Sequence, residues 1–142
     1  MAGGRTSPAQ SVRIRQVILM IPDTTVLEDG LVEYDEHLKH KDWQDALAVL
    51  DALPPPWDKH PQVVVKRLDA LIQAGLHADG LEAALKATHE FPKRAELWHR
   101  LGCLQCLSGQ LEEARASIRN ALALEPALKS ELMLDPRLRN IR

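Results

Sequence analysis

The stretch 95–126 constrains the fold of this chain more than any other part of the sequence. On each side of Gly109, apolar or small residues recur every three to four positions. This spacing places them on one face of a helix, whereas a strand would alternate every second residue. Gly109 can adopt the left-handed conformation that ends a helix, and Pro126 disfavours helical geometry at Glu125 before it. The stretch is therefore expected to form two amphipathic helices joined by a tight turn.

Similar residues recur at a fixed spacing in this stretch and in the chain before it. One example of this spacing is the distance in sequence from Gly75 to Gly109. The same step connects Ala87 to Ala121, Pro92 to Pro126, and the small residues Ala46, Gly80 and Ala114 to one another in turn. Short side chains at repeated positions let adjacent antiparallel helices approach closely. The repetition predicts an all-α fold of about three helix pairs, at 26–58, 61–92 and 95–126.

The stretch 95–126 resembles one tetratricopeptide repeat, a helix–turn–helix unit of about 34 residues. The matching residues are Trp98, Leu101, Gly102, Ala114, Ile118, Ala121 and Pro126. Gln105 departs from the pattern, because the family usually has an aromatic residue three positions after the glycine. The two earlier pairs match less well: Gly30, Glu33 and Tyr34, and then Val64, Arg67 and Leu68, stand where the family has Trp and Leu-Gly. The resemblance implies a right-handed solenoid, in which stacked units bury the apolar faces that one unit alone would expose.

The proline pattern predicts how the chain is divided. Residues 1–22 are expected to form an N-terminal arm, disordered over 1–6 and helical over 8–20, although alternating residues near Ile14 also fit a strand. Residues 23–142 are expected to form a single domain. After the third pair, a capping helix over 126–141 is expected to cover the apolar edge of that pair.

Charge is distributed unevenly along the chain. The formal net charge is −2, which argues against nucleic acid as the main partner. Residues 1–22 contain three arginines and no acid, whereas residues 23–60 contain ten acids and three lysines. The longest unbroken apolar run, 17–21, is too short to cross a membrane. Two cysteines do not form a secreted disulfide framework, so a cytoplasmic location is expected.

His99, Cys103 and Cys106 fall on one face of the predicted helix, at positions i, i+4 and i+7. Imidazole and thiolate groups bind zinc or copper, so a metal-binding or redox helical protein is one interpretation. The other is that these three residues pack or line a groove. No fourth ligand is evident nearby, and no metal or other cofactor is expected.

The resemblance also implies a partner site, because tetratricopeptide repeats bind ligands in a concave groove lined by the first helix of each unit. The residues carried over to that groove are Glu28, Leu31, Asp35, Lys66, Asp69, Gln73, Glu96, His99, Arg100 and Cys103. Some relatives grip a terminal carboxylate with Lys and Asn at fixed positions, and only Lys66 and Arg100 fit that pattern here. A mixed-charge or basic helical peptide suits this groove better.

No motif for catalysis accompanies these features: a phosphate-binding glycine loop, a GxSxG elbow and an HExxH pair are all missing from the sequence. The expected function is a non-catalytic protein–protein interaction module that binds a peptide or helix. One alternative is a bacterial secretion-type chaperone that holds an aggregation-prone partner. The N-terminal arm is a further candidate for pairing two copies of the chain, since a homodimer would bury the apolar run 17–21.

Overall fold

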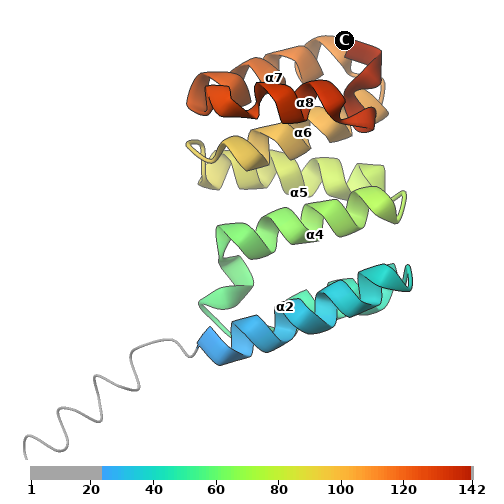
Figure 1. Cartoon of the computed structure of the whole chain (residues 1–142), viewed down its shortest axis with the longest axis vertical. Coiled ribbons are helices and arrows are strands. Elements are labelled where there is room, and N and C mark those ends of the chain that lie inside the picture. The colour runs from blue at the N-terminus through green and yellow to red at the C-terminus, as the bar shows by residue number, and fades with distance from the viewer. Residues whose placement is uncertain (1–23, 142) are drawn as a thin grey trace, which may run out of the picture.

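The computed structural model describes residues 24–141, and every regular element in that part of the chain is helical (Figure 1). The α-helices are α2 (Thr24–Lys39), α3 (Trp43–Asp51), α4 (Pro61–Gln73), α5 (His77–Glu90), α6 (Ala95–Leu107), α7 (Leu111–Leu124) and α8 (Lys129–Leu134). The same residues include the 3-10 helices η1 (Trp57–Lys59), η2 (Pro126–Leu128) and η3 (Pro136–Ile141). None of the described helices has the length and apolar character needed to span a membrane. The arm predicted at 1–22 lies outside the described residues.

The helices pair as α2 with α3, α4 with α5, and α6 with α7, and the pairs stack along the long axis of the molecule (Figure 1). The turns between partners share one geometry. Lys41, Gly75 and Gly109, which are equally spaced in the sequence, have φ values of 59°, 76° and 81°. In each turn the following N–H bonds back to the carbonyl five residues earlier, as in a Schellman motif. The predicted left-handed conformation at Gly109 is confirmed.

Lys41 is the one turn residue of these three that is not glycine, and we expect Lys41→Gly to raise the free energy of unfolding by about 1 kcal/mol. A side chain with a Cβ is strained in this conformation, whereas glycine adopts it freely. Urea denaturation measures the change. Lys39→Gly is the control, because Lys39 is the last residue of α2 and its replacement should lower stability instead. An equal or lower stability of Lys41→Gly would contradict the account.

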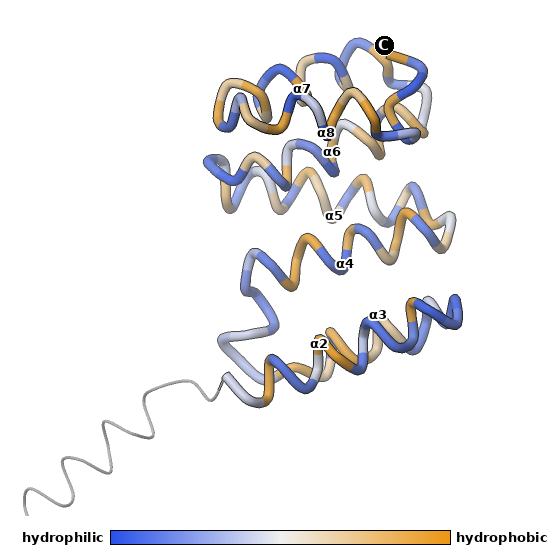
Figure 2. The backbone as a smooth tube through the Cα atoms, viewed as in Figure 1, coloured by the Kyte–Doolittle hydropathy of each residue, from blue (hydrophilic) through white to orange (hydrophobic). Residues whose placement is uncertain are grey.

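Two apolar clusters form the core, and α4 contributes to both of them. Figure 2 shows the apolar residues that recur along the helices. The larger cluster joins α4, α5, α6 and α7 to residues 126–141, which form the C-terminal segment. Leu68 and Leu104 are fully buried in this cluster. The smaller cluster joins α2 and α3 to other positions of α4, around Tyr34 and Leu50. The first helix pair is therefore attached to the rest of the stack mainly through α4.

The connection between α3 and α4 is longer than that between α5 and α6, and it contains Pro54, Pro55 and Pro56. His60 precedes α4, and its Nδ1 accepts a hydrogen bond from the backbone N–H of Gln62 at 3.2 Å. Pro61 is the first residue of α4, as the sequence predicted. Across the junction, the hydroxyl of Tyr34 donates to the carbonyl of Lys66 at 2.6 Å, which fixes α2 against α4.

The structure divides the capping helix predicted over 126–141 into three short helices. The segment folds as η2, α8 and η3, with a break at Asp135, which has extended backbone geometry. Pro136 causes this break, because proline disfavours helical geometry at the preceding residue. The segment nevertheless covers the third helix pair, since Leu132 and Leu138 are buried in the larger cluster.

Candidate functional site

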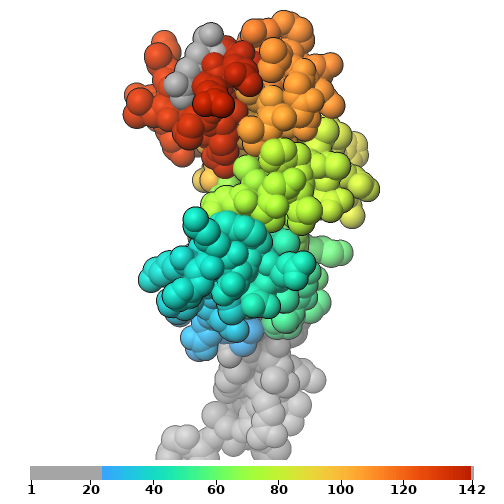
Figure 3. Space-filling view, turned by 90° about the vertical axis from the view of Figure 1, so that its right-hand side faces the viewer, coloured from blue at the N-terminus to red at the C-terminus, as the bar shows by residue number. Residues whose placement is uncertain are grey.

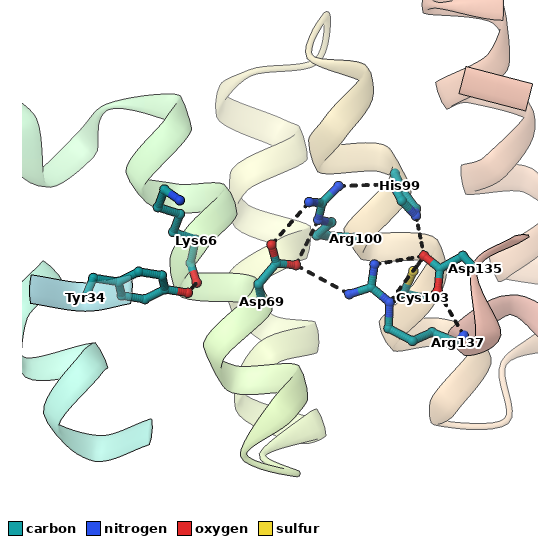
Figure 4. Close-up of polar contacts among 8 residues, drawn as sticks. All are labelled: Tyr34, Lys66, Asp69, His99, Arg100, Cys103, Asp135 and Arg137. Carbon is teal, nitrogen blue, oxygen red and sulfur yellow. Dashed lines mark hydrogen bonds and ion pairs between the residues drawn. The ribbon is translucent and has the colours of Figure 1, made fainter. Parts of the chain in front are cut away.

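The helices α4 and α6 are joined by a bidentate ion pair. The guanidinium of Arg100 donates to both carboxylate oxygens of Asp69, at 2.9 and 3.1 Å (Figure 4). Burial lowers the pKa of Arg100, but the hydrogen bonds and charge of Asp69 outweigh burial and raise it. Such paired geometry holds both side chains in place, so this part of the α4–α6 surface is preformed.

Asp135 lies at the centre of a second set of contacts, in the break between α8 and η3 (Figure 4). Arg137 donates to it from its backbone N–H at 2.9 Å and from its guanidinium at 2.8 Å. His99 Nε2 lies 2.7 Å from Oδ2, and the thiol of Cys103 donates to the same oxygen at 3.5 Å. Burial raises the pKa of Asp135, but the hydrogen bonds from His99 and Arg137 outweigh burial and hold this pKa well below its usual range.

His99 connects the two sets of contacts. Arg100 Nη1 lies 3.0 Å from His99 Nδ1, and a guanidinium can only donate, so Nδ1 is the acceptor. The proton of the neutral ring is then on Nε2, where it is donated to Asp135. The guanidinium of Arg137 also donates a hydrogen bond to a carboxylate oxygen of Asp69 at 3.4 Å, which connects Asp135 to the Asp69–Arg100 pair. A continuous polar network therefore runs from α4 through α6 to the C-terminal segment.

The structure places the ten predicted groove residues in three different settings. Glu28, Asp35, Gln73 and Glu96 are exposed, and Leu31, Lys66, Asp69 and Arg100 are half-buried. His99 and Cys103 do not line an open groove, because their exposed fractions are 2% and 0%. The C-terminal segment covers them, and sequence spacing within α6 alone did not indicate this cover.

Residues from α4 and α6 come together with the C-terminal segment around a depression of about 440 Å³. Its charged lining is Lys66, Asp69, Glu96, Arg100, Glu125 and Glu131. Glu125 and Glu131 were not predicted, since they follow the helices that the repeat pattern assigns to a groove. Glu96, Glu125 and Glu131 are exposed, and no ion pair joins them to any residue in the described part of the chain.

The two cations of the depression are already engaged. Lys66 Nζ lies 3.8 Å from a carboxylate oxygen of Asp35 and 5.4 Å from the centre of the Tyr34 ring. Arg100 is held by Asp69 and His99, as described above. Both groups would have to leave these partners to bind a terminal carboxylate. Within the described part of the chain, the acids at the rim of the depression have no ion-pair partner, whereas its two cations each have one.

The His99 and Cys103 side chains also belong to a possible metal-ligand set, but Asp135 is the third member and Cys106 is not. The ligating atoms of these three residues lie within 4.8 Å of one another. Burial raises the pKa of the Cys103 thiol well above its usual range, although Arg137 opposes that shift. Asp135 already accepts hydrogen bonds from His99 and Arg137. A metal ion would have to displace a guanidinium and deprotonate a buried thiol, so the set is better described as a hydrogen-bonded ion cluster.

Stacked helix pairs with a repeated turn, and a charged surface along successive helices, define an all-α helical-repeat protein. Residues 95–128 match the family model of the tetratricopeptide repeat. This match spans α6, α7 and η2, so the chain carries a tetratricopeptide repeat at the position that the sequence predicted. No curated protein shows significant similarity to the chain.

Proposed function

We propose that this chain is a non-catalytic protein–protein interaction module that binds a basic peptide or helix along α2, α4 and α6. The repeat at residues 95–128 supports an interaction role, since this family generally mediates protein–protein contacts. The groove itself is the finer part of the proposal. It includes the exposed predicted residues Glu28, Asp35, Gln73 and Glu96, and adds Glu125 and Glu131.

The imbalance of charge in the depression carries the proposal. Glu96, Glu125 and Glu131 are solvent-exposed acids without an ion-pair partner in residues 24–141, whereas Lys66 and Arg100 are paired. The lining also includes the apolar side chains Val65 and Leu128. A partner with Lys or Arg beside apolar residues would complement both parts of this surface. An acidic partner would meet only repulsion at the rim.

Charge reversal tests the proposal, with fluorescence anisotropy as the measurement. The probe is a labelled amphipathic helical peptide with lysines on its polar face, and its matched counterpart has glutamates instead. We expect the lysine peptide to bind and Glu96→Lys/Glu131→Lys to weaken this binding by about tenfold. Equal binding of both peptides, or unchanged affinity of the double variant, would overturn the proposal.

Glu113→Lys is the matched control. Glu113 is an exposed residue of α7, outside the lining of the depression, so its reversal changes the net charge equally per site. We expect this variant to bind the lysine peptide as the unmodified chain does. A comparable loss in the control would attribute binding to overall charge rather than to the depression.

A further inference from the structure

The first helix pair has an open crevice at the end of the stack, away from the depression described above. The crevice has a volume of about 740 Å³, and it is lined by residues of α2, of α3 and of the turn that follows α3. Its exposed lining consists of the apolar residues Val26, Ala48 and Ala52 and the acids Asp29, Glu33 and Asp45. A space-filling view shows this pair at one end of the described part of the chain (Figure 3).

The equivalent surface is partly covered in the second helix pair. The repeat step takes Glu33 to Arg67 and Val49 to Ala83, which are half-buried and line a depression between α4 and α5. Residues of the preceding pair, among them Asp51, complete that depression. Arg67 donates to Asp51 at 3.1 Å across this boundary. The surface that is open in the first pair is therefore an inter-pair contact in the second.

In the third helix pair, the equivalent surface is more deeply buried than in the second. The next repeat step takes Arg67 to Leu101 and Ala83 to Ser117, whose exposed fractions are 2% and 4%. The helix that covers this pair is α5, which packs along α6. In each later pair, the chain that immediately precedes the pair fills this position. For the first pair, the preceding chain is residues 1–23.

The sequence before α2 has apolar residues at the spacing of the buried and half-buried positions of α5. In α5 and at its end, the residues that precede Pro92 by eight, five, four and one positions are Ala84, Ala87, Thr88 and Phe91, all buried or half-buried. At the same distances before Pro22 the sequence has Ile14, Val17, Ile18 and Ile21. A helix over 8–21 would be about 20 Å long, close to the length of α2. The short connection at Pro22 and Asp23 favours antiparallel packing of such a helix on α2.

Charge also matches this segment to the crevice. Residues 8–21 contain Arg13 and Arg15 and no acid, whereas the crevice presents Asp29, Glu33 and Asp45. We propose that residues 8–21 bind in this crevice of their own chain, where their apolar side chains cover the end of the smaller core cluster. Ion pairs at the rim would fix the orientation of the segment.

Cysteine labelling in the full-length chain tests the proposal. Ala52→Cys places a thiol in the crevice, and its rate of reaction with a maleimide reports how often the crevice is open. We expect Ile14→Glu/Ile18→Glu to raise this rate at least about tenfold, because buried carboxylates would release the segment. Gln16→Glu adds an acid to the opposite side of the segment and should leave the rate nearly unchanged. The native Cys103 and Cys106 are buried, and the unmodified chain gives their background rate.

A second thiol position and the protein concentration separate the possible occupants. Leu85→Cys, on an exposed position of α5, should react at one rate in all backgrounds. Protection of Ala52→Cys that is constant over about a hundredfold range of concentration supports binding within one chain. Protection that grows with concentration, with a doubled mass by light scattering, would assign the crevice to a second copy and overturn the proposal. An unprotected Ala52→Cys would also overturn it.

Discussion

Replacement of Asp135 by alanine is expected to lower the free energy of unfolding by about 3–5 kcal/mol. Asp135 is buried, and the substitution leaves His99, Cys103 and the guanidinium of Arg137 without their common acceptor. Removal of one member of a buried charged cluster costs more than the cluster itself contributes, because the remaining charge stays poorly solvated. Urea denaturation followed by circular dichroism measures the loss.

Asp51→Ala is the matched control for this substitution. Asp51 also accepts a hydrogen bond from an arginine, Arg67, at 3.1 Å, but the Asp51 side chain is 68% exposed. Its loss is expected to cost less than about 1 kcal/mol, as for most surface ion pairs. Similar losses for the two variants would show that burial of the Asp135 cluster has no energetic importance.

The same carboxylate predicts how stability depends on pH. Because the folded state holds the pKa of Asp135 well below its usual range, its contribution is fully present above the unfolded pKa of about 4. This contribution is lost as the pH falls further toward the folded pKa. The difference in stability between the unmodified chain and Asp135→Ala should therefore shrink in acid. A difference that stays constant from neutral pH to about pH 2 would contradict the assignment.

Replacement of Leu104 by alanine is expected to cost about 3–4 kcal/mol and to weaken the packing of α4 to α7. Leu104 is fully buried in the larger cluster, where its methyl groups occupy the space above Gly80 of α5. Without this side chain, folding buries less apolar surface, and a cavity remains in the core. Urea denaturation should detect the loss, whereas Leu134→Ala, at an 80% exposed position, should change stability by less than about 0.5 kcal/mol.

Leu50→Ala removes an equally buried leucine but should act on a smaller part of the molecule. Leu50 lies in the smaller cluster, which connects to the remainder through α4. Hydrogen exchange is expected to lose protection in α2 and α3 while α6 keeps most of its own. Leu104→Ala should lower protection in α4 to α7 together. An even loss of protection along the whole chain in Leu50→Ala would show that the two clusters unfold as one unit.

The repeat pattern predicted the helix pairs and the turn at Gly109 because both depend on local sequence. Periodicity defines a buried face, and glycine or proline defines where a helix ends. The repeat register also predicted which small residues lie where helices approach closely. Lys41 was not predicted as a turn residue of the same kind, since lysine carries no local signal for a left-handed backbone. Only its position in the register, one repeat step before Gly75, indicates it.

The contents of the candidate site could not be predicted in the same way. Asp135 and His99 are far apart in the sequence, and they meet because η3 folds back after Pro136. The sequence indicates a break at Asp135 but not the direction that the chain takes after it. Charge counts likewise identified an acidic surface without showing which acids are paired. The free acids Glu125 and Glu131 are recognised only once the C-terminal segment is placed beside α4 and α6.

Through Asp69, a partner that binds nearby would affect how firmly the C-terminal segment is held. Its carboxylate receives Arg100 from α6 and Arg137 from the C-terminal segment, so a single side chain of α4 is shared by two donors. A basic partner that pairs with Asp69 would compete with Arg137, and the work of releasing Arg137 would be subtracted from the observed affinity. By reciprocity, a bound partner would loosen the C-terminal segment by the same free energy. If a basic partner binds as proposed, occupancy of the depression and attachment of that segment would therefore be two linked equilibria.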